Sequence, residues 1–330
     1  MSAGEAAAFI RQHRRFLLLC HVSPDGDALG SSLALGLALE AAGREWTAAC
    51  DTVCYPHKYA FLPGADRVHV GGTPVTPEPD TALIFVDCAS ADRAGLYASL
   101  LEEERPTLCI DHHITNPGCK GQGYAGVNYV EDCAAAGELV YLLIRELGVP
   151  LTADMAACLY TALSTDTGNF AYDSVTKRTF CIMGALLEAG LDLPKYNQLL
   201  FRQERLAKTR LRARAVEHMT LYEENTVAVA SLTLGEIEAA GGVSADCDGI
   251  IDTLRDIETV EAACFIREST QGLKVSLRSK GRLNVAELAG RFGGGGHVLA
   301  AGCTLLHMTM EEACSRMAAV LCEAWRESRP

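Results

Sequence analysis

The feature that most constrains the fold is an alternation, in the first half of the chain, of short apolar segments with helix-like segments. Strands that are apolar throughout are buried on both faces, and helices between them favour a mostly parallel sheet with helices on both sides. We therefore predict an α/β fold. Strands are expected at 16–20, 45–49, 81–86 and 107–110, and helices at 5–13, 30–43, 92–104, 134–148, 152–164 and 176–189.

The pattern changes in the second half of the 330-residue chain, which is long enough for two domains. Residues 191–224 look helical and basic, either as a solvated linker or as a basic wall beside a substrate cleft. We expect a first domain at 1–190, a helical linker at 191–214 and a smaller α/β domain at 215–330. In that domain, strands are expected at 226–232, 260–266 and 273–277, and helices near 246–256, 284–290 and 309–326.

Metal-binding side chains are grouped directly after the first expected strand. His21, Asp25 and Asp27 lie within seven residues. Singly, His21 could be a structural histidine, Asp25 a turn former and Asp27 a helix cap. Together, two carboxylates and an imidazole in one turn raise each other's pKa unless a cation neutralises them. Because ligands collect at the carboxyl ends of strands in open α/β sheets, the group predicts a metal site.

Three later positions repeat this pattern. Asp87 follows the apolar segment 83–86, where a cap for a helix at 89–101 is the alternative. Asp111-His112-His113 follows segment 108–110; adjacent histidines on an extended segment point to opposite faces, so one could bind metal while the other meets substrate. Asp111 could then orient one ring. Asp166 ends a helix, where a negative charge is unfavourable without compensation.

Aspartate and histidine without cysteine favour Mn²⁺ or Mg²⁺ over structural zinc, and the imidazoles favour Mn²⁺. Four elements ending in such residues predict two ions, Mn²⁺ by preference, with Mg²⁺ or Co²⁺ as substitutes. A pair of ions about 3.5–4 Å apart needs a bridging carboxylate and suits in-line displacement at phosphorus. The hypothesis is therefore a two-metal hydrolase.

The second domain carries a different kind of motif. Four consecutive glycines, Gly293 to Gly296, precede His297. Such a run exposes backbone N–H groups and lets an anion approach closely, although a hinge or turn is the alternative. Arg278 and Ser279 follow a strand, and the planar guanidinium suits a phosphate. Two anion sites on two domains favour a substrate with two separated phosphates.

Charge and composition exclude several classes. The net charge of −13 argues against broad capture of duplex nucleic acid, which needs a basic face. No apolar run reaches the roughly 18 residues of a membrane helix. The 14 cysteines form no Cys-x-x-Cys pair and mostly lie in apolar segments, which indicates reduced thiols and a cytoplasmic location.

The motifs resemble those of the DHH phosphoesterases. The resemblance rests on His21-x-x-x-Asp25-Gly26-Asp27-Ala28-x-Gly30-Ser31, Val86-Asp87, Asp111-His112-His113 and Ser164-Thr165-Asp166-Thr167-Gly168-x-Phe170. Ser276-Leu277-Arg278-Ser279 and Phe292-Gly293-Gly294-Gly295-Gly296-His297-x-x-Ala300-Ala301-Gly302 are similar to the associated DHHA1 domain. The match spans about residues 14–305. Within the family, the chain is most similar to the stand-alone nanoRNase/pAp-phosphatase group, the NrnA-like proteins.

The resemblance implies a role for each matching residue. His113, Asp87 and Asp111 would be the catalytic residues, with His113 touching the scissile phosphate. One Mn²⁺ would be held by His21, Asp25 and Asp87, and the other by Asp27, Asp87, His112 and Asp166. Substrate would be bound by His113, Arg278, Ser279, Gly294, Gly295, Gly296 and His297.

The resulting functional hypothesis is a Mn²⁺-dependent hydrolase of very short oligoribonucleotides and of pAp, acting through two-metal activation of water. The alternative is a phosphodiesterase for cyclic or linear dinucleotides of the c-di-AMP or pApA type. A pyrophosphatase, a processive RecJ-type exonuclease and a regulator that has lost its chemistry are disfavoured. The expected partners are short single-stranded RNA or a small nucleotide, with no duplex and no membrane; a homodimer is left open.

Overall fold

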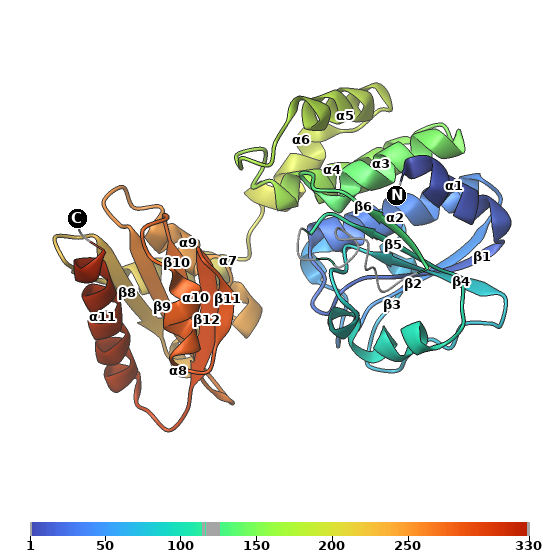
Figure 1. Cartoon of the computed structure of the whole chain (residues 1–330). Helices are drawn as coiled ribbons and strands as arrows, with labels where there is room; N and C mark the ends of the chain where they lie inside the picture. The colour runs from blue at the N-terminus through green and yellow to red at the C-terminus, as the bar shows by residue number, and fades with distance from the viewer. Residues whose placement is uncertain (1, 114–115, 117–125, 329–330) are drawn as a thin grey trace. The chain divides into compact units, whose positions relative to one another are not determined.

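The computed structural model describes residues 2–113, 116 and 126–328, and the chain forms two compact units, Met1–Gln203 and Glu204–Pro330. Each unit contains one six-stranded sheet (Figure 1). The mixed α/β class predicted from the alternating pattern is confirmed. The boundary between the units falls within the linker expected at 191–214. Leu200 is buried in the core of the first unit, and Leu211 is buried in a core of the second.

The sheet of the first unit is parallel throughout, in the order β3-β2-β1-β4-β5-β6. Strands β2 and β3 are therefore added on one side of β1, and strands β4, β5 and β6 on its other side. The point between β1 and β4 is the topological switch at which α/β sheets bind ligands. The strands are β1 (Arg15–Leu19), β2 (Glu45–Ala49), β3 (Val68–His69), β4 (Thr81–Val86), β5 (Thr107–Asp111) and β6 (Val127–Val130).

Alternate residues of each central strand enter different cores because strand side chains point to opposite faces. In β1, Phe16 and Leu18 pack under the α-helices, whereas Leu17 and Leu19 pack against the other layer. The α-helical layer lies above the sheet in Figure 1. It comprises α1 (Ala3–Gln12), α2 (Gly26–Ala41), α3 (Ala136–Leu147) and α4 (Ala153–Asp166), with α5 (Lys177–Glu188), α6 (Leu193–Asn197) and η5 (Gln198–Arg202) beyond them.

The opposite face is covered by η3 (Ala91–Glu102), where a continuous helix at 92–104 was expected. Gly95 has a φ of 58° and breaks the segment into two short turns. A Cβ at this position would lie 2.2 Å from Asp51 Oδ2, so the close approach requires glycine. The short 3₁₀ turns η1 (His57–Tyr59) and η2 (Ala65–Arg67) also fall outside the predicted elements.

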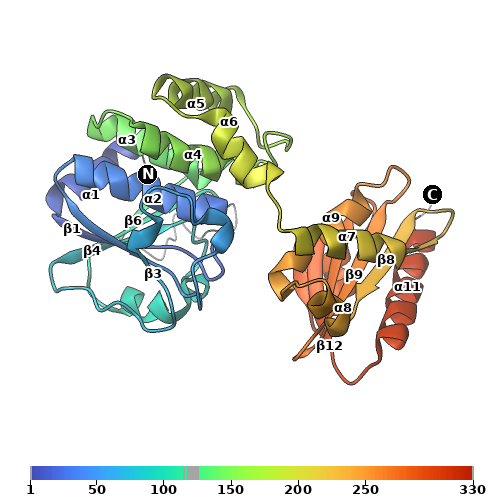
Figure 2. The ribbon, with the colours of Figure 1, turned by 180° about the vertical axis from the view of Figure 1, so that it is seen from behind.

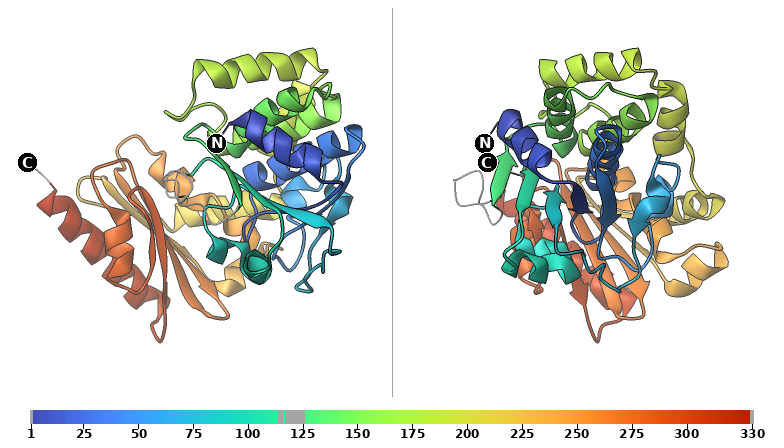
Figure 3. Two further views of the ribbon diagram at one scale, coloured as in Figure 1. Left: turned by 45° about the vertical axis from the view of Figure 1, so that its right-hand side comes forward. Right: turned by 90° about the vertical axis from the view of Figure 1, so that its right-hand side faces the viewer.

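The second unit has a mixed sheet in the order β11-β12-β10-β9-β8-β7, in which only β8 and β9 pair in parallel. Helices α10 and α11 cover one face, and α7, α8 and α9 cover the other (Figures 1 and 2). Figure 3 shows α11 along its face of the sheet. The elements are α7 (Leu206–Glu217), β7 (Thr220–Tyr222), β8 (Val227–Leu232), α8 (Leu234–Ala239), η6 (Ser244–Cys247), α9 (Ile250–Arg255), β9 (Ala262–Ser269), β10 (Gly272–Ser279), α10 (Val285–Gly290), β11 (Gly295–His297), β12 (Ala300–Leu305) and α11 (Met310–Glu327).

The basic segment at 191–224 is not one helix. It contains α6, η5 and α7 with an extended break between η5 and α7, and then β7. Several of its arginines pair with acids: Arg205 with Asp246, and Arg212 with Glu204. Within the described ranges all cysteines are free thiols, and no helix there has both the length and the apolar character that a bilayer crossing requires.

Candidate metal centre

The predicted metal ligands come together at the carboxyl edge of the first sheet. His21 follows β1, Asp87 follows β4, and His112 follows β5. Asp25 and Asp27 stand at the start of α2, and Asp166 is the last residue of α4. Parallel strands bring their carboxyl ends to one edge, which explains why segments so far apart in sequence meet.

One cluster is formed by His21, Asp25 and Asp87. His21 Nε2 lies 3.9 Å from Asp25 Oδ1 and 3.5 Å from Asp87 Oδ2. The Nδ1–H of the same ring donates to the Val22 carbonyl at 2.7 Å, which leaves Nε2 facing the carboxylates. A metal-binding imidazole is commonly held in this way by its other nitrogen.

A second cluster is formed by Asp27, His112 and Asp166. His112 Nε2 lies 3.6 Å from Asp27 Oδ2 and 3.4 Å from Asp166 Oδ2. Its Nδ1–H donates to the Cys133 carbonyl at 3.0 Å, so Nε2 again faces carboxylates. The proximity of His112 supplies the compensation that a carboxylate at the C-terminus of α4 needs.

Asp87 lies between the two clusters. Its Oδ2 faces His21, whereas its Oδ1 lies 3.5 Å from His112 Nε2. Oδ1 is buried and makes no hydrogen bond. The residue has a φ of 55°, a left-handed conformation that costs a non-glycine residue on the order of 1–3 kcal/mol and is concentrated at functional sites. The helix cap considered for Asp87 is not formed; Ser90 is the N-cap of η3.

The site is electrostatically frustrated without a cation. Burial, together with the charges of Asp87 and Asp166, raises the pKa of Asp27 well above its usual value. Burial also raises the pKa of Asp166 to about 6. Burial opposes charge on His112, but Asp87, Asp27 and Asp166 raise its pKa to about 10. Burial likewise opposes ionisation of Asp87, but His112 and His21 lower its pKa to about 2. Oxygen and nitrogen donors crowded in this way fit one or more divalent cations.

Asp27 is fixed by groups that the sequence did not reveal. Its oxygens accept from the backbone N–H of Ala136 at 2.6 Å and of Gly137 at 3.0 Å, at the N-terminus of α3. The buried Ser31 hydroxyl donates to Asp27 Oδ1 at 2.8 Å. The helix cap considered for Asp27 is instead made by Asp25, which accepts from the N–H groups of Asp27 and Ala28.

His113 is held by a buried carboxylate. Its Nδ1–H donates to Asp111 Oδ1 at 2.8 Å, which fixes the orientation of the ring. The other oxygen of Asp111 accepts from Asn116 Nδ2 at 2.6 Å, a contact that sequence analysis missed because an asparagine five residues on carries no pattern.

The opposite orientation predicted for the two histidines is wrong. His113 Nδ1 and His112 Nε2 lie 3.4 and 3.5 Å from the same Asp87 Oδ1, and the two rings are 4.8 Å apart. The reason is that β5 ends at Asp111, so the alternation of a strand does not extend to the histidines.

In the second unit, the structure aligns Arg278 and His297. Both residues pair with Ala300, Arg278 from β10 and His297 from β11, so the three form one row across neighbouring strands. His297 is exposed. Arg278 is partly engaged, because its Nε donates to Asp252 Oδ1 at 3.2 Å. Ser279 is buried, and its hydroxyl oxygen accepts from the N–H groups of Gly281 and Leu283, which gives it a role in the turn after β10.

In the glycine run from Gly293 to Gly296, some residues allow close backbone packing and others leave an open surface. The N–H groups of Gly293 and Gly294 bond to carbonyls of α10, so they are not open to an anion as the sequence suggested. A Cβ on Gly294 would lie 2.2 Å from the Gly302 carbonyl oxygen, and Gly296 has a φ of 143°. Gly295 has open space around it. The hairpin of β11 and β12 therefore needs glycine for its own geometry.

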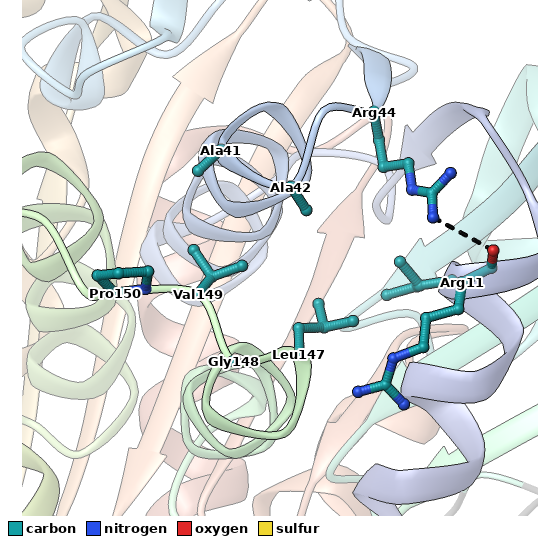
Figure 4. Close-up of a pocket in the computed structure, with 9 residues that line it drawn as sticks. Arg11, Ala41, Ala42, Arg44, Leu147, Gly148, Val149 and Pro150 are labelled. Carbon is teal, nitrogen blue, oxygen red and sulfur yellow. Dashed lines mark hydrogen bonds between the residues drawn. The ribbon is translucent and has the colours of Figure 1, made fainter.

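A pocket of about 330 Å³ lies away from these residues (Figure 4). It is lined by the ends of α1, α2 and α3, where Arg44 donates to the Arg11 carbonyl. Arg44 precedes β2 and Arg11 precedes β1, so the pocket is at the amino edge of the sheet. It contains none of the predicted site residues and no carboxylate or imidazole.

Comparison with known proteins agrees with this geometry. Residues 15–163 match the model of the DHH family N-terminal domain, and residues 224–323 match the DHHA1 domain. A protein named bifunctional oligoribonuclease and PAP phosphatase NrnA, from Thermus thermophilus, is 33% identical over 90% of this chain and 86% of its own length. The chain belongs to the DHH phosphoesterase family.

Other members extend the likeness over both units. The Bacillus subtilis protein of the same name is 26% identical over 86% of this chain and 87% of its own. The crystal structure of an exopolyphosphatase-related protein from Bacteroides fragilis superposes with a TM-score of 0.89 at 24% identity, covering 99% of this chain and 97% of that one. The last comparison shows the fold. DHH phosphoesterases are metal-dependent, and the clusters around Asp87 are groups able to hold metal in this member.

Proposed function

We propose that this DHH phosphoesterase hydrolyses very short oligoribonucleotides to mononucleotides, and pAp to AMP and phosphate, with two Mn²⁺ ions. The substrate class follows from similarity to relatives named oligoribonuclease and PAP phosphatase. The observation that carries the mechanism is the position of Asp87, whose two oxygens face different clusters. A buried carboxylate with one oxygen lacking a hydrogen bond is suited to bridge two cations.

The donor set supports Mn²⁺. His21, Asp25 and Asp87 would hold one ion, and Asp27, Asp87, His112 and Asp166 the other. Carboxylate and imidazole donors without thiolate suit Mn²⁺, with Mg²⁺ or Co²⁺ as substitutes. When bound, the ions would lower the pKa of water and neutralise charge on the phosphoryl oxygens.

The remaining groups orient the substrate. His113, whose ring is held by Asp111, would contact the scissile phosphate and help to stabilise charge on its oxygens. Arg278 and His297 supply donors for a second phosphate. Gly295 and Gly296 leave that surface free of side chains, and we assign Ser279 and Gly294 a supporting role in the same hairpin rather than direct contact.

Exchange of Asp87 tests the two-metal site. Asp87→Ala is expected to abolish hydrolysis of pApA and pAp and to lower bound Mn²⁺ from two ions per chain, while circular dichroism stays unchanged. Electron paramagnetic resonance of the wild type should show exchange-coupled Mn²⁺, which the variant loses. Asp66→Ala is the control, because Asp66 is exposed and distant in sequence from the ligands. Hydrolysis by Asp87→Ala at the wild-type rate would overturn the mechanism.

A substrate panel tests the specificity. With Mn²⁺, catalytic efficiencies are compared for pAp, pApA, cyclic di-AMP, pyrophosphate and RNAs from two nucleotides upward. We expect the highest values for pApA and the shortest RNAs, followed by pAp. A preference for cyclic di-AMP would favour the dinucleotide-signal alternative, and a preference for pyrophosphate would contradict the assignment.

A further inference from the structure

Two exposed aromatic side chains follow the end of α4, where Asp166 lies. Of the Phe, Tyr and Trp side chains that the structure describes, only Tyr172 and Phe180 are exposed, each by 59%. Tyr172 lies in the segment between α4 and α5, and Phe180 lies in the first turns of α5 (Figure 1). Grouped exposed apolar side chains mark ligand- or partner-binding surfaces, whereas single ones need no explanation.

The segment between α4 and α5 is folded tightly against the end of α4. Three successive residues, Gly168, Asn169 and Phe170, have φ values of 58°, 58° and 66°. Two of these are not glycine, and such conformations persist where the surroundings enforce them. The Tyr172 N–H donates to the Thr167 carbonyl at 3.1 Å, and the Phe170 N–H donates to Thr167 Oγ1 at 3.0 Å.

This folding places the Tyr172 ring against Gly168, directly after the end of α4. A Cβ on Gly168 would lie 2.5 Å from the Tyr172 ring, so the ring sits directly over a glycine two residues from Asp166. Any side chain at Gly168 would displace it. The ring is therefore positioned next to the end of α4, with its other surface free toward solvent.

Phe180 is held by a row of rings that reaches the core. Its centroid lies 5.9 Å from that of Phe170, which lies 6.4 Å from that of Tyr160. Tyr160 is fully buried, and its hydroxyl accepts from Asn197 at 3.1 Å. A row anchored in this way loses little conformational entropy when a flat ligand binds.

We propose that Tyr172 and Phe180 form a stacking surface for the nucleobase of a nucleotide whose phosphate is at the metal centre. This inference rests on the proposed function and specifies which residues recognise the base. Stacking is tolerant of sequence, because every base has a π-face, so the surface fits a hydrolase of short RNA without a fixed base preference. A second copy of this chain is the competing occupant, but two exposed rings offer little of the area that a stable dimer buries.

Kinetics with a base-free substrate test the surface. Stacking contributes about 1–3 kcal/mol per base, so Tyr172→Ala should raise KM for pApA by about 10-fold or more and change kcat little. Phe180→Ala should act in the same direction. Both variants should leave hydrolysis of an abasic analogue of pApA unchanged. Tyr172→Phe should behave as wild type. Leu187→Ala is the matched control, because Leu187 is an exposed apolar residue of α5, the helix that contains Phe180.

Fluorescence of 2-aminopurine riboside 5′-monophosphate separates this inference from the proposed function, because its binding needs no turnover. Binding to wild type should quench the fluorescence, and Tyr172→Ala should remove the quench. Quenching without hydrolysis of any substrate would refute the proposed function and leave the stacking surface standing. The stacking surface would be refuted if both alanine variants kept the wild-type quench and the wild-type KM. It would also be refuted if their catalytic efficiency fell as much on the abasic analogue as on pApA. Dissociation of a dimer as the only effect of the substitutions would refute it as well.

Discussion

At the residue scale, the buried pair of Asp111 and His113 sets the direction of one imidazole. Asp111 is fully buried, and both of its oxygens are used, one by His113 and one by Asn116. A carboxylate in this position fixes the tautomer and the orientation of the ring. These two contacts therefore fix the orientation of the His113 ring.

Substitutions at this pair should affect kcat more than KM. Asp111→Asn keeps the shape but removes the acceptor charge, and we expect kcat for pApA to fall by about 10²-fold or more. Asn116→Ala should cost about 10-fold, because Asp111 keeps its contact with His113. Steady-state kinetics with bound Mn²⁺ measured in parallel distinguish ring orientation from metal loss. An unchanged kcat in Asp111→Asn would contradict the role given to His113.

The pH dependence of the metal-free protein follows from raised pKa values. The pKa of Asp166 is raised to about 6 and that of His112 to about 10, so both groups stabilise the fold at low pH. Their contributions are lost as pH rises through about 6 and about 10. Mn²⁺ replaces the protons they hold, so its stabilising effect should grow with pH.

Thermal unfolding tests this linkage. We expect Tm in EDTA to fall between pH 6 and pH 9, and the increase in Tm on adding Mn²⁺ to be larger at pH 8 than at pH 6. Asp87→Ala should show little increase at either pH. An increase that is independent of pH would mean that the ligands are already deprotonated in the metal-free protein.

At the element scale, the N-terminus of α3 is a structural support for the metal site. Its first N–H groups bind Asp27, and its buried Glu138 accepts from Arg178 Nε and from Thr179 Oγ1, both at 2.6 Å. Arg178 and Thr179 belong to α5, so Glu138 ties two helices together at the point where one of them binds Asp27.

Loss of the contacts between Glu138 and α5 should lower both the stability of the fold and the affinity for metal. Glu138→Ala leaves Arg178 with Glu131 as its remaining ion-pair partner and removes the acceptor of the Thr179 hydroxyl. We expect a destabilisation of about 2 kcal/mol, below the range for fully buried pairs. The Mn²⁺ affinity should fall because α3 no longer holds Asp27 firmly. Chemical denaturation and titration calorimetry measure the two effects. Glu146→Ala, at an exposed site of the same helix, should change neither.

The elements themselves show where local patterns suffice. The strands β1, β2, β4 and β5 and the helices α3, α4 and α5 lie within a few residues of the predicted ranges, because apolar runs and helical periodicity are local signals. The two-residue β3 was missed because its hydrogen bonds depend on β2. The 3₁₀ turns of η3 were missed because the left-handed conformation of Gly95 depends on Asp51, far from it in sequence.

At the scale of the whole molecule, each unit has hydrophobic cores of its own. In both units, one core cluster lies on each face of the sheet. No core cluster includes residues of both units among the described residues. Units with separate cores can unfold separately.

Calorimetry should therefore resolve two transitions. The proposed metal ligands all belong to the first unit, so we expect Mn²⁺ to raise one transition and leave the other in place. Arg278→Ala and His297→Ala should leave the Mn²⁺-sensitive transition unchanged, while they raise KM for pApA. A single transition that shifts as a whole with Mn²⁺ would show that the units unfold together.

The sequence by itself determined the fold class, the family and the metal-ligand candidates, because each rests on residue types placed directly after a local apolar run. Only the tertiary structure decided how these residues face one another. The orientation of His112 and His113 about Asp87 and the support of Asp27 by α3 both depend on segments distant in sequence. Such contacts leave no periodic signal in the chain, because they arise when parallel strands bring their carboxyl ends to one edge of the sheet.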